Sequence, residues 1–180
     1  MKRICALALV LFLLIPGAWA AELRVPGVFS IEYPDDWLDY GGEGEYAEDC
    51  YELSFICGPL ATDPNLSVHA AYYPEFARLR LFDADEATIA DYAEWIADGH
   101  LRGELIEIRR AGEDAIPFVL LRLEVSQGEF LTASTFANGW MLDFQLYAYA
   151  DARFEESRAM GDADLEILRA MLDSFEALAG

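Results

Sequence analysis

Apolar and polar residues alternate in two segments near the start of the chain, and this alternation predicts β-strands. In the segment 28–33, apolar side chains occupy every second position, as on a strand with one buried face. Pro34 and the acidic residues after it end this strand. The acidic, glycine-rich segment 39–49 predicts an exposed loop, and the alternating segment 65–73 predicts a second strand.

Two later segments have apolar residues at helical spacing. The first begins after Asp83 or Asp85, either of which can cap a helix, and ends near Gly99. The second extends from about 162 to 178 and has capping aspartates in its first turn. Each has an apolar stripe and acidic residues on the other side, so both predict amphipathic helices packed on a sheet.

Four apolar segments lie between these helices and predict an antiparallel meander: 105–110, 117–126, 130–137 and 140–150. The last two are joined by Asn138-Gly139, a dipeptide typical of the two-residue type I′ hairpin. The pattern therefore predicts an α+β fold, in which a mainly antiparallel β-meander sheet is flanked by helices in a single domain, 21–180.

The hairpin register also predicts a polar second face on the sheet. Unpaired charges are costly in a core, so we expect a three- or five-residue loop, or a bulge, around Gly128. Such a loop moves Arg122 and Glu124 out of the core layer and onto the polar face. The resulting candidate binding face consists of Arg122, Glu124, Thr132, Ser134, Asp143, Gln145 and Tyr147. The alternative is that helices or loops cover this face.

The first twenty residues have the pattern of a secretory signal peptide. Lys2 and Arg3 precede an apolar run that ends at Ile15, and the small residues before Ala21 predict cleavage between Ala20 and Ala21. The run is too short to span a membrane as a helix. We therefore expect residues 1–20 to be removed, leaving a periplasmic or secreted protein without a stable membrane anchor.

Charge narrows the range of partners. The chain has 33 acidic and 12 basic residues, a formal net charge of −21, and its only lysine lies in the predicted signal peptide. Nucleic-acid binding is disfavoured because phosphate contacts need clustered Lys and Arg. The acidity fits either a high-salt or alkaline habitat or drift in a GC-rich genome, and we expect self-repulsion to make fold stability salt-dependent.

Cys50 and Cys57 are the only cysteines after the predicted cleavage site. In an exported chain a disulfide is expected. A straight strand from Cys50 to Cys57 would separate their Cα atoms by about 23 Å, far beyond the roughly 4.4–6.8 Å of a disulfide. We favour a disulfide-closed loop; free thiols and pairing between molecules are the alternatives.

Recognised catalytic motifs are missing from the sequence. There is no G-x-S-x-G, H-E-x-x-H or P-loop pattern, and His69 and His100 both fit structural positions. We therefore expect no enzyme activity, no cofactor and no metal site. The alternatives are a carboxylate-dependent hydrolase acting on envelope glycans, which needs two carboxyl groups in a cleft, and weak divalent-cation binding by the acidic segment 35–49.

Two short motifs resemble the PsbP-like superfamily, which includes the DcrB-like proteins. They are Phe29-Ser-Ile-Glu-Tyr-Pro-Asp-Asp-Trp37 and Met171-Leu-Asp-Ser-Phe175. The resemblance implies a small secreted or periplasmic α+β protein that binds or assists a partner without catalysis. The sequence as a whole therefore predicts an exported, non-catalytic binding or accessory protein of the bacterial envelope, with a protein partner of unknown identity.

Overall fold

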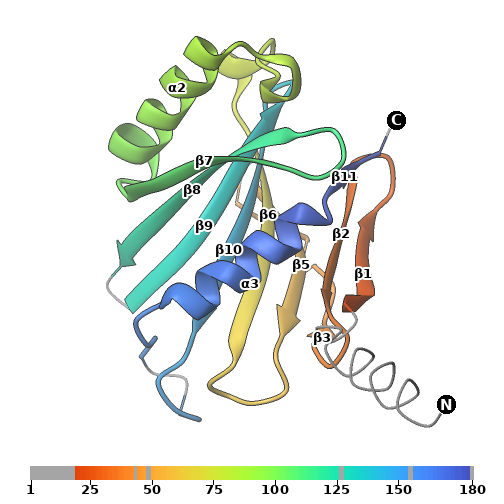
Figure 1. Cartoon of the computed structure of the whole chain (residues 1–180), viewed down its shortest axis with the longest axis vertical. Coiled ribbons are helices and arrows are strands. Elements are labelled where there is room, and N and C mark those ends of the chain that lie inside the picture. Colours follow the sequence, from red (N-terminus) through yellow and green to blue (C-terminus); the bar gives the residue numbers. More distant parts are fainter. Residues whose placement is uncertain (1–18, 43, 48–49, 126–127, 154–155, 179–180) are drawn as a thin grey trace, which may run out of the picture.

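Two antiparallel sheets dominate the computed structural model, which describes residues 19–42, 44–47, 50–125, 128–153 and 156–178 (Figure 1). The larger sheet has the order β3-β5-β6-β10-β9-β8-β7, and β4 pairs with β5 beside it. Its strands are β3 (Leu38–Asp39), β4 (Gly44–Ala47), β5 (Cys50–Cys57), β6 (Pro64–Tyr72), β7 (Glu104–Ala111), β8 (Ile116–Val125), β9 (Gly128–Ala137) and β10 (Trp140–Ala148). The smaller sheet has the order β1-β2-β11 and consists of β1 (Trp19–Val25), β2 (Phe29–Pro34) and β11 (Glu176–Ala177). The predicted α+β fold is confirmed.

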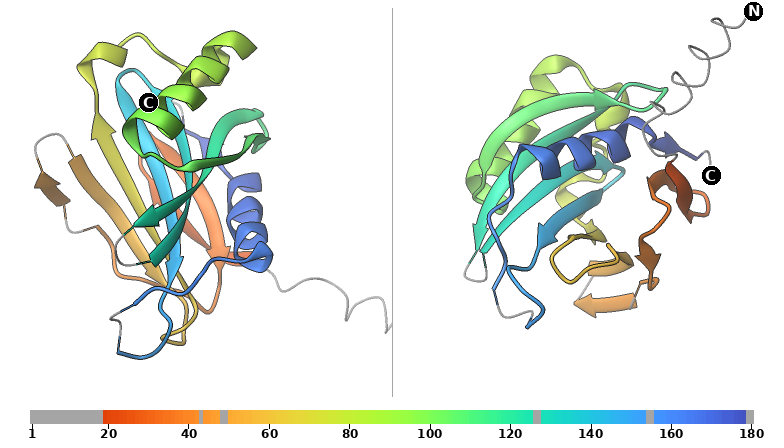
Figure 2. Two further views of the ribbon diagram at one scale, coloured as in Figure 1. Left: turned by 90° about the vertical axis from the view of Figure 1, so that its left-hand side faces the viewer. Right: turned by 60° about the horizontal axis from the view of Figure 1, so that its bottom comes forward.

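The helices cover opposite sides of the larger sheet (Figure 2). Short 3-10 turns η2 (Pro74–Phe76) and η3 (Leu81–Asp83) precede α2 (Glu86–Glu94), which continues as the π-helical turn η4 (Trp95–His100). Asp85 caps α2 as predicted, since its carboxylate accepts the Thr88 N–H at 2.8 Å. The last helix, α3 (Asp162–Asp173), follows the meander. Gly161, not an aspartate, is its N-cap residue, and Asp164 accepts the Gly161 N–H.

Apolar side chains are buried on both faces of the larger sheet. On one face, Phe118 and Phe144 pack with Phe29 and Phe175 from the smaller sheet and the end of α3. On the other face, α2 and η4 cover a second cluster built around Phe136. The sheet is thus the middle layer of the fold, and burying both faces requires strands that are apolar on both sides.

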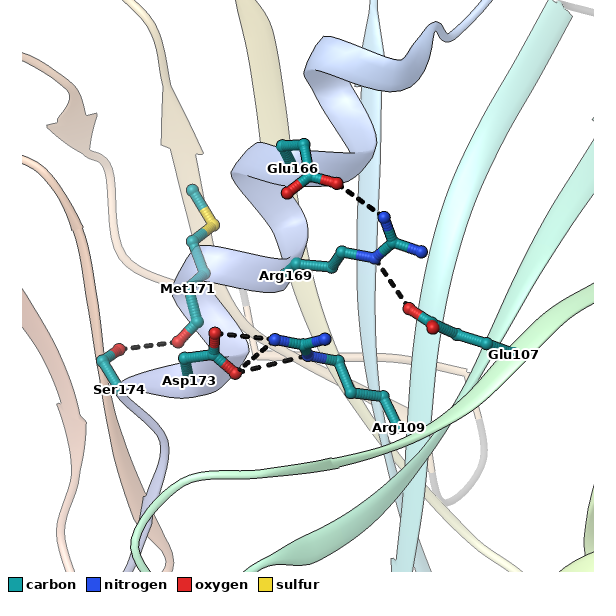
Figure 3. Close-up of polar contacts among 7 residues, drawn as sticks. All are labelled: Glu107, Arg109, Glu166, Arg169, Met171, Asp173 and Ser174. Atoms are coloured by element: carbon teal, nitrogen blue, oxygen red, sulfur yellow. Dashed lines mark hydrogen bonds and ion pairs between the residues drawn. The ribbon is translucent and has the colours of Figure 1, made fainter.

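Arginine–carboxylate pairs connect α3 to the edge strand β7 (Figure 3). Arg109 on β7 binds both carboxylate oxygens of Asp173 at 2.7 Å. Arg169 on α3 donates to Glu107 on β7 at 2.7 Å and to Glu166 one turn earlier at 2.6 Å. Because these pairs are partly exposed, they contribute little stability, but they set the orientation of the helix on the strand.

The smaller sheet was not predicted, and it explains why α3 ends five residues before the expected position. The Ser174 hydroxyl donates to the Met171 carbonyl at 2.6 Å and accepts the Glu32 N–H at 2.8 Å, so it connects the helix end to β2. Beyond it the chain is extended, and Leu178 donates its N–H to Val28. The predicted helical tail is therefore a strand partner of β2.

The predicted register is correct for one hairpin and wrong for the next. Ala137 pairs with Trp140 and Ser134 with Asp143, as the Asn-Gly turn requires. In the preceding hairpin Val125 pairs with Gly128, which leaves two residues between them, so the predicted odd loop or bulge is wrong. The physical reason is that β8 is buried on both faces. A two-residue connection therefore leaves its apolar side chains buried whichever face they point to.

The cysteine-containing segment is also a correction. Cys50 and Cys57 lie at the two ends of the extended strand β5, opposite Ala71 and Asn65 of β6, with one register shift between Glu52 and Ser54. The favoured disulfide-closed loop is therefore wrong, because an extended strand holds the two sulfur atoms too far apart. Part of the predicted exposed loop before it is structured as β3 and β4, which pair with the same strand.

The predicted signal peptide lies almost entirely outside the described residues, which begin at Trp19. The predicted cleavage site, between Ala20 and Ala21, falls near the start of β1. The residues that follow it, from Ala21 to Val25, pair with β2. Within the described part of the chain, no helix has the length and apolarity needed to cross a membrane.

Candidate functional site

The register places the predicted binding face on two sides of the sheet rather than one. Thr132, Ser134, Asp143, Gln145 and Tyr147 share the face that α2 partly covers. Arg122 and Glu124 point to the opposite face, because Arg122 pairs with Leu131 and Glu124 with Glu129. Their assignment to the polar face is therefore wrong, and the seven residues do not form one surface.

Arg122 instead has a structural role at the end of the core. Its guanidinium forms an ion pair with Glu129 and donates to the Met160 carbonyl at 2.7 Å. The Met160 N–H in turn donates to the same Glu129 carboxylate at 2.9 Å. We expected the Arg122 charge to be too costly on the core face, but these partners at the margin of the sheet compensate it. Glu124 is exposed beyond it.

Asp143 is the most unusual of the remaining candidates because it is a carboxyl group only 2% exposed. The Ser134 hydroxyl donates to one of its oxygens at 2.9 Å, and the Gln145 amide donates to the other at 2.6 Å. Burial raises the pKa of Asp143 to about 6, and these two hydrogen bonds oppose the rise. Opposite it on β6 stands His69, whose pKa is lowered by burial.

This arrangement does not form a site for acid–base catalysis. Ser134 and Thr132 are fully buried, and Asp143 is closed off from solvent in the same way, so none of them can contact a substrate. Gln145 and Tyr147 are half-buried at the open part of the face. Across the described residues, no group of three or more His, Cys, Asp or Glu side chains could hold a metal ion.

A hollow lies on the other face, between the two sheets. It is an apolar cleft of about 610 Å³, within the range of roughly 300–1,000 Å³ typical of ligand pockets. Its lining comes from the β1–β2 turn, β5, β6, η3, the β9–β10 hairpin and β11: Val25, Gly27, Val28, Leu53, Ala70, Arg80, Phe82, Ala137, Asn138, Trp140, Leu142, Ala177 and Leu178. Sequence reasoning missed this site because two of its walls belong to the unpredicted smaller sheet.

Aromatic packing and exposed apolar groups mark the mouth of the cleft. Trp140 is 37% exposed and packs on Tyr72 and Tyr51, with ring centroids 5.1 and 5.8 Å apart. Val28, on the facing turn, is 41% exposed. Arg80 is the one charged side chain among the described lining residues, and its ion pair with Asp83 is long, at 3.8 Å. The cleft can therefore receive an apolar group, and the described part of its lining offers no carboxyl or imidazole group to act on it.

Comparisons with known proteins identify the fold. No family model and no curated protein matches the sequence. Among solved structures, the solution structure of cyanobacterial PsbP (CyanoP) from Synechocystis sp. PCC 6803 is similar with a TM-score of 0.51 at 17% identity, covering 91% of this chain and 95% of that one. A crystal structure from Bacteroides thetaiotaomicron matches with a TM-score of 0.47 at 12% identity, covering 89% of this chain and 49% of the other. The first likeness confirms the resemblance seen in the two sequence motifs: the chain has a PsbP-like fold.

Proposed function

We propose that this chain is an exported, non-catalytic binding or accessory protein of the bacterial envelope, and that it holds a small apolar ligand in the cleft between its two sheets. The observation that carries the proposal is the lining of that cleft: the thirteen described residues that form it include no Asp, Glu, His, Cys, Ser, Thr, Lys or Tyr. Catalysis needs a titratable or nucleophilic group at the reacting atoms, whereas binding needs only shape and apolar surface.

The walls of the cleft are held in place before any ligand binds. Ala70 and Leu142 belong to neighbouring strands of the larger sheet, where they pair directly. The opposite wall is fixed by the hydrogen bond from the Leu178 N–H to the Val28 carbonyl, at 3.0 Å. A preformed cleft lowers the conformational entropy that a ligand must remove on binding.

The alternatives considered from the sequence receive no support from the described residues. A glycan hydrolase needs two carboxyl groups that face a substrate, and Asp143, the carboxyl with the most strongly raised pKa, is buried under α2. The acidic segment 35–49 includes residues outside the described part of the chain. A protein partner in the envelope stays a prediction.

A binding assay with an uncharged fluorescent probe, N-phenylnaphthylamine, tests the proposal. We expect one saturable site per chain. Ala177→Trp fills the cleft from β11 and should weaken probe binding about tenfold or more. Ala87→Trp adds the same bulk at an exposed position of α2 and serves as the matched control. Thermal unfolding confirms that both variants fold. Absence of probe binding, or equal affinity in the two variants, would refute the cleft as the site.

A further inference from the structure

A second, smaller hollow lies on the opposite face of the larger sheet from the cleft. Its volume is about 290 Å³, just below the roughly 300–1,000 Å³ typical of ligand pockets, so its occupant must be small. It is lined by Tyr40, Gly41, Glu52, Phe55, Ser67 and Tyr147. This is the part of the predicted binding face that α2 leaves open, and Tyr147 is the member of that face that reaches it.

The strand register explains why these residues converge. Phe55 on β5 pairs with Ser67 on β6, and Ser67 pairs with Gln145 on β10. Tyr40, just after β3, donates its N–H to the Phe55 carbonyl at 2.9 Å. Four neighbouring strands or strand ends therefore contribute to one row on this face, and Tyr147 lies two residues from Gln145 on the same side.

Local contacts hold the aromatic walls. The Asp39 carboxylate accepts the Gly41 N–H at 2.7 Å and the Ser54 hydroxyl at 2.5 Å, which fixes the segment that contains Tyr40 over β5. The Tyr40 ring lies 6.3 Å from that of Phe55. On the other side, the Tyr147 ring packs on Phe130 at 5.0 Å.

The charge of the lining selects the sign of the ligand. Among the described residues that line the hollow, Glu52 is the one charged side chain, and none of them is an arginine or a histidine. Burial raises the pKa of Tyr147, so its ring stays neutral at physiological pH. Aromatic faces attract cations, and they favour methylated ammonium groups, whose weak hydration makes desolvation cheap. A carboxylate beside aromatic rings is the chemistry that recognises such a group.

We propose that this hollow binds the methylated ammonium group of a small choline-like molecule, with Tyr40, Phe55 and Tyr147 as aromatic walls and Glu52 as the counter-ion. The site is separate from the apolar cleft and does not depend on the function proposed for it. The same ammonium chemistry occurs in free choline and in the headgroup of a phosphatidylcholine lipid.

Calorimetric titration of the purified protein with choline tests the charge and ring requirements. We expect binding of choline and none, or at least fivefold weaker binding, of dimethylbutanol, its uncharged carbon analogue. Tyr40 is 68% exposed, so replacing it does not disturb the core. Tyr40→Leu should weaken choline binding about two- to fivefold, whereas Tyr40→Phe keeps the ring and the affinity. Glu52→Gln should weaken binding and reduce its dependence on salt.

Two arms distinguish the source of the ammonium group. Binding of free choline without sedimentation on phosphatidylcholine vesicles assigns a free small molecule. Sedimentation on phosphatidylcholine vesicles but not on phosphatidylglycerol vesicles assigns the lipid headgroup. Absence of binding to both, equal binding of choline and dimethylbutanol, or an unchanged affinity in Tyr40→Leu would overturn the proposal.

Discussion

Asp143 provides a direct test of how the sheet tolerates a buried carboxyl group. In the unfolded chain an aspartate has a pKa near 3.9, and burial raises that of Asp143 to about 6. The folded state therefore holds its proton more tightly, so the contribution to stability is present below about pH 4 and is lost as pH rises through 6. A shift of about two pH units corresponds to about 3 kcal/mol.

Replacement by Asn removes the charge and keeps the shape. In the native chain the Ser134 hydroxyl and the Gln145 amide both donate to Asp143. In the variant the Asn oxygen can accept from the Ser134 hydroxyl, and the Gln145 side chain can turn so that its oxygen accepts the N–H that the new Asn amide donates. We expect the free energy of unfolding of Asp143→Asn, relative to the native chain, to increase by about 1.4 kcal/mol per pH unit between about pH 4 and 6, then stay level.

Urea unfolding at several pH values measures this difference. His69, Tyr73 and Tyr92 face Asp143 from β6, the segment after it and α2, and they are present in both proteins, so their titration largely cancels. Asp91→Asn on the exposed side of α2 controls for removing one negative charge from an acidic chain. A difference for Asp143→Asn that does not change with pH would refute the assignment of a raised pKa.

Three further outcomes follow from the packing. Phe175→Ala should destabilise the protein by about 3–5 kcal/mol in urea unfolding, because its ring is buried against three other phenylalanines; a loss below about 1 kcal/mol would contradict this. Asp164→Asn should cost about 1–3 kcal/mol at neutral pH. Arg158 lowers the pKa of Asp164, so this loss should shrink as pH falls below 4, opposite in sign to the effect at Asp143; a loss that grows instead would refute the pairing. Alkylation in denaturant without reductant should label both Cys50 and Cys57, as intact mass measurement will show, because no bond joins them. An unlabelled chain two hydrogens lighter than the reduced chain would contradict the extended strand between them.

The hairpin of β9 and β10 was predictable because local chemistry determines it. Asn138 and Gly139 both have positive φ, 54° and 88°, as a type I′ turn requires, and few other dipeptides accept this backbone. Once the turn is fixed, every cross-strand pair follows from counting. Ser134 and Asp143 could therefore be placed side by side from the sequence alone, and their hydrogen bond confirms the pairing.

The neighbouring hairpin could not be predicted by the same reasoning. On a strand with a single core face, the charged residues identify the face that points away from the core. In the structure Val119 and Leu120 are both fully buried, one toward α2 and one toward α3. Because both sides of β8 are buried, alternation of apolar and polar residues does not show which side faces the core. The charged residues at the end of the strand show only where the core ends.

The cleft depended on contacts that no local pattern contains. Its wall forms where Ala177 pairs with Phe29, almost the whole length of the chain away. The alternation of Ala21, Leu23 and Val25 with Glu22 and Arg24 was a usable signal for β1, but the placement of that strand against the larger sheet is a tertiary property. Sequence patterns find strands more readily than they find which strands face each other across a cavity.

The distribution of arginine shows how a strongly acidic chain keeps a defined fold. Of the nine ion pairs among the described residues, four involve α3, through Asp164, Glu166, Arg169 and Asp173. Two of these four pairs, Arg109 with Asp173 and Arg169 with Glu107, join the helix to the edge strand β7. Salt screens these attractive pairs and the repulsion among the surplus carboxylates alike. Because the chain has 33 acidic and 12 basic residues, pairs of like charge outnumber pairs of opposite charge. Screening by salt should therefore favour the folded state overall.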